Sequence, residues 1–138
     1  MNITEVKIIL AAEDLGFNQH IRAFASVVVN DELCIRDMKV LRGAKGLFVA
    51  MPSRKILDRC HFCLTKNHLR ARFCNQCGGR LNENRAEVDE DGRSKLHSDV
   101  CHPINHGVRV ELEQAVLDGY EVALREHVAA AVAERGAA

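Results

Sequence analysis

Two C-x-x-C pairs lie ten residues apart in the middle of the chain, and they constrain its fold more than any other feature. The pairs are Cys60-His-Phe-Cys63 and Cys74-Asn-Gln-Cys77. Each pair can direct two thiolates at one point, and two pairs complete the closed tetrahedral shell of four sulfurs that holds structural zinc. Gly78 follows the second pair and permits the positive φ that turns backbone N–H groups towards sulfur. The spacing therefore predicts a compact zinc ribbon, or a pair of zinc knuckles, with these four cysteines as ligands.

Other arrangements of the same residues remain open. The thiols can pair as two disulfides or stay free, and His61 or His68 can replace one cysteine ligand. Disulfides are typical of oxidising compartments, and nothing else in the chain indicates one. A catalytic zinc needs an open coordination position, which four cysteine ligands do not leave. We therefore expect a structural Zn²⁺ ion.

The basic residues are concentrated around the cysteines. The whole chain has 19 basic and 19 acidic residues, but residues 54–85 carry eight basic and two acidic ones, and residues 86–138 carry five and eleven. Four thiolates around Zn²⁺ add two negative charges, so residues 54–85 stay near +4 when metal is bound. Lysine and arginine neutralise phosphates, which makes this segment a candidate surface for DNA or RNA. The candidate contacts are Arg54, Lys55, Arg59, Lys66, Arg70, Arg72 and Arg80, with Arg85 nearby and Asn75 and Gln76 for base readout.

The N-terminal part of the chain has the pattern of an antiparallel sheet. β-Branched residues and period-two alternation predict strands at residues 3–12, 20–29, 33–42 and 47–51, with a turn or loop at residues 13–19 and a short fifth strand at 97–102. The segment 20–42 is a predicted hairpin. The wholly apolar segment 47–51 is expected to be buried on both faces.

The C-terminal part has the pattern of one long amphipathic helix at residues 106–134. Asn105 is a good N-cap for it. Apolar residues recur at every fourth position and form a stripe expected to pack on the sheet: Val108, Leu112, Val116, Tyr120, Leu124, Val128 and Val132. The polar residues 82–95 are a predicted linker before this segment.

These elements predict an α+β fold, with a small antiparallel β-sheet packed on one long C-terminal helix and an inserted zinc-ribbon-like module with four cysteine ligands. The main domain would comprise residues 1–57 and 97–138, and the inserted module and linker residues 58–96. One helix covers one face of a sheet, and Phe24 and Val28 point to the other face. We expect a homodimer to cover them.

Three segments resemble those of the SpoVG family, the stage V sporulation protein G or septation regulators. They are Gly46-Leu-Phe-Val-Ala-Met-Pro-Ser-Arg-Lys55, the strand segment Ile35-Arg-Asp-Met-Lys-Val40, and His102-Pro-Ile-Asn105 with Arg109, Glu113-Gln-Ala-Val-Leu117 and Tyr120. The resemblance covers roughly residues 1–57 and 97–125. It implies a small α+β fold, a homodimer, a cytoplasmic bacterial protein, nucleic-acid binding, and a regulatory role in septation, sporulation or gene expression. It also adds Arg109 to the candidate nucleic-acid contacts.

Two functions therefore compete. One is a nucleic-acid-binding regulator with a structural zinc module, and the other is a zinc-ribbon module that docks a regulatory protein partner without contacting nucleic acid. The alternative to both is a charged loop that binds nothing. We expect no enzymatic activity, because no acid/base carboxylate pair or phosphate-binding glycine loop is visible.

The remaining cysteines and histidines suggest no catalytic site. The group His97, Cys101, His102 and His106 is close in sequence, but His102 lies in the resemblance segment, and Cys101 and Cys34 are expected to be small core residues. No apolar run is long enough to span a membrane and no signal peptide is visible, so we expect a cytoplasmic protein with no membrane partner.

Overall fold

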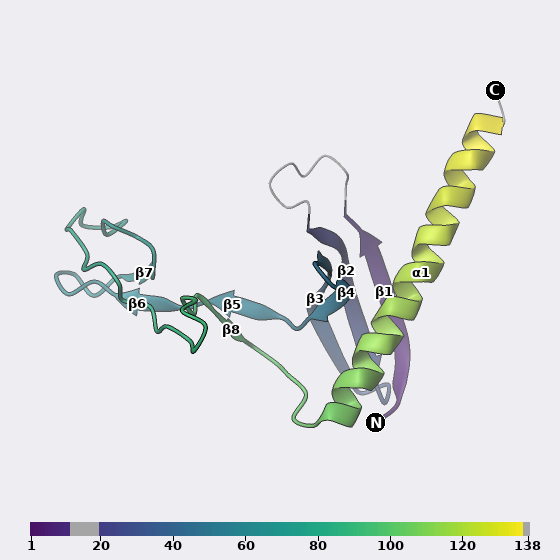
Figure 1. The fold of residues 1–138 in the computed structure, drawn as a ribbon, viewed down its shortest axis with the longest axis horizontal. Coiled ribbons are helices and arrows are strands. Elements are labelled where there is room, and N and C mark those ends of the chain that lie inside the picture. The colour runs from purple at the N-terminus through teal and green to yellow at the C-terminus, as the bar shows by residue number, and fades with distance from the viewer. Residues whose placement is uncertain (12–19, 137–138) are drawn as a thin grey trace. The chain divides into compact units, whose positions relative to one another are not determined.

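The computed structural model describes residues 1–11 and 20–136, which form two compact units (Figure 1). The first unit comprises Met1–Pro52 and Cys101–Ala138, and the second comprises Ser53–Val100. The second unit extends a few residues beyond the predicted insertion on each side, because residues 53–55 and 97–99 pair with each other. The predicted loop at residues 13–19 and the end of the first predicted strand lie outside the described residues.

The first unit is built on one antiparallel sheet with strand order β1-β2-β3-β4. The strands are β1 (Ile3–Leu10), β2 (Ile21–Val29), β3 (Leu33–Gly43) and β4 (Gly46–Ala50). Asn30 and Asp31 join β2 to β3 with φ angles of 54° and 55°. Positive φ at both central residues matches the right-handed twist of two paired strands, so the predicted hairpin forms.

The helix α1 (His106–Gly136) covers one face of this sheet, which confirms the predicted α+β class (Figure 1). Asn105 caps the helix, since its Oδ1 accepts the Val108 N–H at 2.8 Å. The buried face of the helix presents Leu112, Val116 and Tyr120 to the sheet. Farther along, Leu124, Val128 and Val132 are exposed, so only the first half of the predicted stripe is core.

The prediction that segment 47–51 is buried on both faces is wrong. β4 is the last strand of the sheet, and Leu47 and Phe48 are 41% and 46% exposed. Only Val49 on this strand is buried. Segment 47–51 is apolar throughout, but Phe48 points to the face that the helix leaves uncovered, and Leu47, on the same face as Val49, stays exposed at the start of this edge strand.

The second face of the sheet, which we call the open face, is not covered by α1. Its apolar side chains include Ile9, Phe24, Val28, Cys34 and Phe48, and the charged residues Glu5, Lys7 and Lys39 lie on the same face. Phe24 and Val28 are half-buried and Ile9 is 68% exposed. The prediction that Cys34 is a core residue is wrong, because it pairs with Val28 on this open face and is exposed. Cys101 is half-buried.

The second unit contains two short two-stranded sheets. β5 (Ser53–Lys55) pairs with β8 (His97–Asp99), and β6 (Leu57–Arg59) pairs with β7 (Lys66–His68). The predicted fifth strand at 97–102 is therefore only three residues long. No helix within the described ranges is both long and apolar enough to cross a membrane.

The predicted linker at residues 82–95 contains a hydrogen-bonded turn. Val88 and Ser94 form an antiparallel bridge, and the Asp89 carboxylate accepts the N–H groups of Asp91 and Arg93 at 3.0 and 2.8 Å. A polar segment can form such a turn because an aspartate supplies the acceptors that the backbone lacks.

Candidate metal centre and cationic surface

The two C-x-x-C pairs fold into the same backbone turn twice. In the first, Cys60 N–H donates to Thr65 O and Leu64 N–H donates to Cys60 O, at 2.8 and 2.9 Å. In the second, Cys74 N–H donates to Gly79 O and Gly78 N–H to Cys74 O, at 2.9 and 3.0 Å. The residue after the second cysteine of each pair has a positive φ, 66° at Leu64 and 73° at Gly78. The local sequence thus forms two equivalent knuckles, as the spacing predicts.

The two knuckles bring the four cysteine sulfurs to one point. All four Sγ atoms lie within 4.8 Å of one another, with Cys60–Cys77 and Cys63–Cys74 separations of 3.7 and 3.6 Å. Four sulfurs on a tetrahedral ion with bonds of about 2.3 Å lie about 3.8 Å apart, so the site fits zinc. A disulfide requires about 2.05 Å, so these sulfurs are not disulfide-bonded.

Hydrogen-bond donors surround the sulfurs. The N–H groups of Phe62, Gln76 and Gly79 each donate to a cysteine Sγ at 3.4 Å. The buried Asn67 adds a donor from Nδ2 to Cys74 Sγ, also at 3.4 Å, and its Oδ1 accepts the Asn75 N–H at 2.9 Å. Such donors stabilise thiolates and orient metal ligands.

The pKa values of the Cys74 and Cys77 thiols are shifted in opposite directions. The N–H of Cys77, the Asn67 amide and the Gln76 N–H together lower the pKa of Cys74 to about 6. The Gly79 N–H lowers the pKa of Cys77, but desolvation and the neighbouring thiols outweigh it and raise that pKa to about 11. Once Cys74 is ionised, a second thiolate at Cys77 is disfavoured by desolvation and by the nearby sulfurs. A divalent cation among the sulfurs would remove this repulsion, which is the chemistry of a metal site.

The histidines in this region are not part of the sulfur cluster. Within residues 1–11 and 20–136, the four cysteines form the one group of potential metal ligands close enough to share an ion. The His61 ring packs instead against Phe62, with centroids 4.0 Å apart. The alternative in which His61 or His68 replaces a cysteine is therefore not the arrangement observed.

Arg85 links distant parts of the second unit from the inside. Its side chain is 14% exposed, and its Nε donates to Asp58 Oδ2 at 2.5 Å. The guanidinium also donates to the carbonyls of His68, Ala71 and Asn82. This arginine is committed to internal bonds, so it is not available to bind phosphate.

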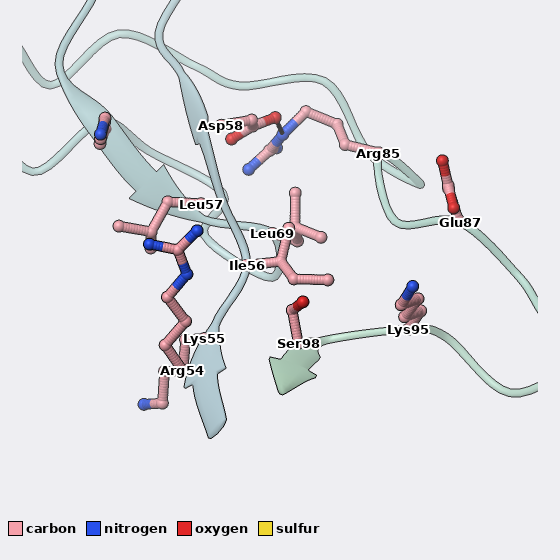
Figure 2. Close-up of a pocket in the computed structure, with 11 residues that line it drawn as sticks. Arg54, Lys55, Ile56, Leu57, Asp58, Leu69, Arg85, Glu87, Lys95 and Ser98 are labelled. Carbon is pink, nitrogen blue, oxygen red and sulfur yellow. Dashed lines mark hydrogen bonds and ion pairs between the residues drawn. The ribbon is translucent and has the colours of Figure 1, made fainter. Parts of the chain in front are cut away.

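A cavity of about 510 Å³ lies beside this ion pair (Figure 2). Ile56, Leu57 and Leu69 form its apolar part, as Figure 2 shows. Four cations line it in addition to Arg85, against the carboxylates of Asp58 and Glu87; these cations are Arg54, Lys55, Lys66 and Lys95. With Asp58 paired to Arg85, the cavity is cationic.

A comparison with known proteins identifies the family. A family model described as SpoVG matches residues 1–122. A septation protein SpoVG of Lachnospira eligens is 32% identical over 123 residues, which cover 89% of this chain and 94% of that protein. Those of Finegoldia magna and Clostridium perfringens are 31% and 30% identical over 87% and 88% of this chain, and 74% and 90% of their own lengths. The chain belongs to the SpoVG family.

Two of the three segments that carry the SpoVG resemblance lie at structural junctions, and the third, residues 35–40, lies within β3. Gly46, with a φ of 118°, closes the turn into β4, and the same segment continues into β5. His102-Pro-Ile-Asn105 leads into the helix that Asn105 caps. The family match ends at residue 122, close to Tyr120, the last buried residue of α1.

The predicted cations of this SpoVG-family chain fall into three groups. Arg54, Lys55 and Lys66 line the cavity. Arg109 lies in the first turn of α1 and belongs to the first unit. The remaining four are exposed on residues 59–82, which we call the cysteine lobe: Arg59, Arg70, Arg72 and Arg80. The tip residues Asn75 and Gln76 are exposed there as well.

Two residues of the site were not found from the sequence. Lys95 reaches the cavity from the chain segment before β8, and Asn67 donates to a cysteine sulfur from β7. Lys95 lies in a segment predicted to be a linker, and Asn67 lies between the two pairs with no motif around it. Isolated polar residues of this kind become recognisable only from their neighbours in space.

The positive φ at the equivalent position of each knuckle can be tested with a matched pair of substitutions. Gly78→Ala should destabilise the second unit by about 1 kcal/mol, because a Cβ disfavours that φ. Leu64→Gly at the equivalent position should not destabilise it, because glycine relieves the same strain and Leu64 is already exposed. Amide exchange across residues 53–100 measures both effects. Equal destabilisation by the two variants would contradict the equivalence of the knuckles.

Proposed function

We propose that this SpoVG-family chain is a cytoplasmic nucleic-acid-binding regulator, in septation, sporulation or gene expression, that carries a structural zinc ion. It acts by binding and not by catalysis. The observation that carries the proposal is the cysteine lobe, where four thiols converge inside a region that contains basic residues but no acidic ones. The names of its relatives, septation proteins, support the regulatory role.

Charge explains why a polyanion would bind here. Between Asp58 and Glu83 the chain contains five basic residues, Arg59, Lys66, Arg70, Arg72 and Arg80. All five are exposed. Together they exceed the charge of −2 that Zn²⁺ with four thiolates contributes, so the lobe stays cationic when metal is bound. The cations of the neighbouring cavity extend the same positive surface within the second unit. Phosphate contacts of this kind attract nucleic acid of any sequence.

Zinc would organise the lobe, because its own core is small. Cys60, Cys74 and Leu81 are its buried core residues, with Ala71 packed against them. Three buried side chains cannot offset the conformational entropy of ordering the lobe. Binding of Zn²⁺ to four thiolates supplies the missing stability in small sites of this type.

The protein should bind one equivalent of zinc through the four converging sulfurs. Cys74→Ala should lose the metal, because it removes a ligand from a closed tetrahedral site. Cys34→Ala and Cys101→Ala are matched controls that lie outside the cluster and should keep one equivalent. Elemental analysis with thiol titration measures this. Zinc retained by Cys74→Ala but lost from a control variant would overturn the ligand assignment.

Nucleic-acid binding should depend on the exposed arginines of the cysteine lobe. The double charge reversal Arg70→Glu with Arg72→Glu should weaken binding to all sequences, and should lower the slope of log K against log salt by roughly 0.7–0.9 per lost phosphate contact. The matched control is Glu113→Lys with Glu121→Lys on α1, which should leave binding unchanged or slightly stronger. Fluorescence anisotropy over a salt series measures both. Unchanged affinity and slope in the arginine variant would refute the assignment.

The second candidate function is docking of a regulatory protein. It is favoured by the exposed apolar side chains Phe62, Leu64 and Phe73 on the same lobe. Capture of one protein, insensitive to salt, would support it over nucleic-acid binding, which must weaken steeply as salt rises.

We also propose that two copies pair through the open face of the sheet, because α1 covers only the other face. Sedimentation equilibrium should give a dimer at tens of micromolar. Ile9→Glu, on the open face, should shift it to monomer with little effect on folding, since Ile9 is exposed. Val110→Glu, at an exposed position of α1, is the control and should stay dimeric. A wild-type monomer would exclude this arrangement.

A further inference from the structure

Two exposed phenylalanine rings lie on the cysteine lobe, and binding of phosphate by the arginines does not involve them. Phe62 is 66% exposed and Phe73 is 60% exposed. Phe62 precedes the last cysteine of the first knuckle, and Phe73 precedes the first cysteine of the second. Exposed large apolar side chains that gather on one small lobe indicate a binding surface.

The first ring is held by the knuckle that carries it. The Phe62 N–H donates to Cys60 Sγ at 3.4 Å, and its ring packs on His61. The ring also lies directly over Gly79, where an added Cβ would come within 2.6 Å of it. Glycine therefore lets this ring pack against the second knuckle while most of its surface stays open.

The second ring is held beside a cation. Phe73 and Arg80 face each other across an antiparallel bridge, and hydrogen bonds on both sides keep this pairing: Cys74 N–H to Gly79 O at 2.9 Å, and Leu81 N–H to Arg72 O at 2.8 Å. Side chains opposite each other on two paired strands lie on the same face. The exposed Phe73 ring therefore lies on the same face of the bridge as the Arg80 side chain.

The charge around these rings selects the kind of partner. The lobe has no acidic residue, so an anionic partner is favoured. The partner must also carry flat apolar groups close to its negative charges, so that the rings and the arginines can bind it together. Unpaired nucleotides offer both, since each joins a phosphate to a base with two free faces. In a duplex the base faces are stacked inside and cannot reach a side-chain ring without unpairing.

We propose that Phe62 and Phe73 stack on unpaired bases, so that the cysteine lobe selects single-stranded nucleic acid over duplex. This rests on the proposed nucleic-acid binding and specifies its substrate class. The arginines contact the backbone, and the rings contact bases without regard to sequence, because every base has an aromatic face. Arg80, beside Phe73, contacts the phosphate that adjoins the stacked base.

The test compares a labelled oligothymidylate with a duplex of the same length, using zinc-loaded protein. Phe62→Leu with Phe73→Leu removes the aromatic faces and keeps apolar side chains. Affinity for the single strand should fall about tenfold per ring, while duplex affinity and the salt slope stay as in the wild type. Val88→Ala, an exposed apolar position of the same unit outside the lobe, is the control and should change nothing. Zinc content confirms that each variant is loaded.

A second measurement includes an arm on the wild type alone, which does not depend on how the variants fold. Abasic sites placed in the oligothymidylate should weaken binding of the wild type by the same factor, and should have no further effect on the double variant. Single-strand binding that is insensitive to both changes would overturn the stacking proposal while leaving nucleic-acid binding intact. Wild-type protein that binds neither strand form, but binds an acidic peptide, would overturn both proposals and assign the rings to a protein partner.

Discussion

The convergence of four cysteine sulfurs on one point is the constraint on which the second unit depends. Each knuckle is a local turn with its own hydrogen bonds, but the lobe buries little more than Cys60, Cys74 and Leu81. The sulfurs stand at separations that suit a tetrahedral ion, and backbone N–H groups point at them. Desolvation and the neighbouring thiols raise the pKa of Cys77, so ionisation of that thiol is disfavoured when no cation is near. The four sulfurs and the N–H groups around them thus form a site that fits a metal ion.

The charge of this unit follows from how its arginines are used. Arg85 satisfies carbonyls and the Asp58 carboxylate inside the unit, which neutralises one of the two carboxylates at the cavity. The arginines of the lobe remain exposed. An internal arginine therefore helps to leave the cavity with uncompensated positive charge.

The first unit has a different constraint: its sheet has two faces, and the helix α1 can cover only one of them. The buried side of the sheet is made of small and branched residues such as Ala23, Ala25 and Val27, which let α1 approach closely. Gly119 on the helix lies so near Val6 that a Cβ there would come within 2.9 Å of it. The opposite face keeps Phe24 and Val28 half-buried and Ile9 exposed, so on the side away from the helix the unit presents apolar side chains next to the charged Glu5, Lys7 and Lys39.

The features that the sequence by itself determined are those that depend on neighbours along the chain. Spacing of three residues defines each cysteine pair, alternation defines the strands, and Asn105 before an apolar stripe defines the start of α1. The tertiary structure alone decided the features that depend on partners far apart in sequence. Strand order made β4 an edge, and pairing with Val28 placed Cys34 on the open face. The ion pair with Asp58 took Arg85 out of the exposed cations, and folding of residues 82–95 brought Lys95 to the cavity. Local patterns record backbone geometry and amphipathicity, but whether a side chain is buried, paired or free is settled only when distant segments meet.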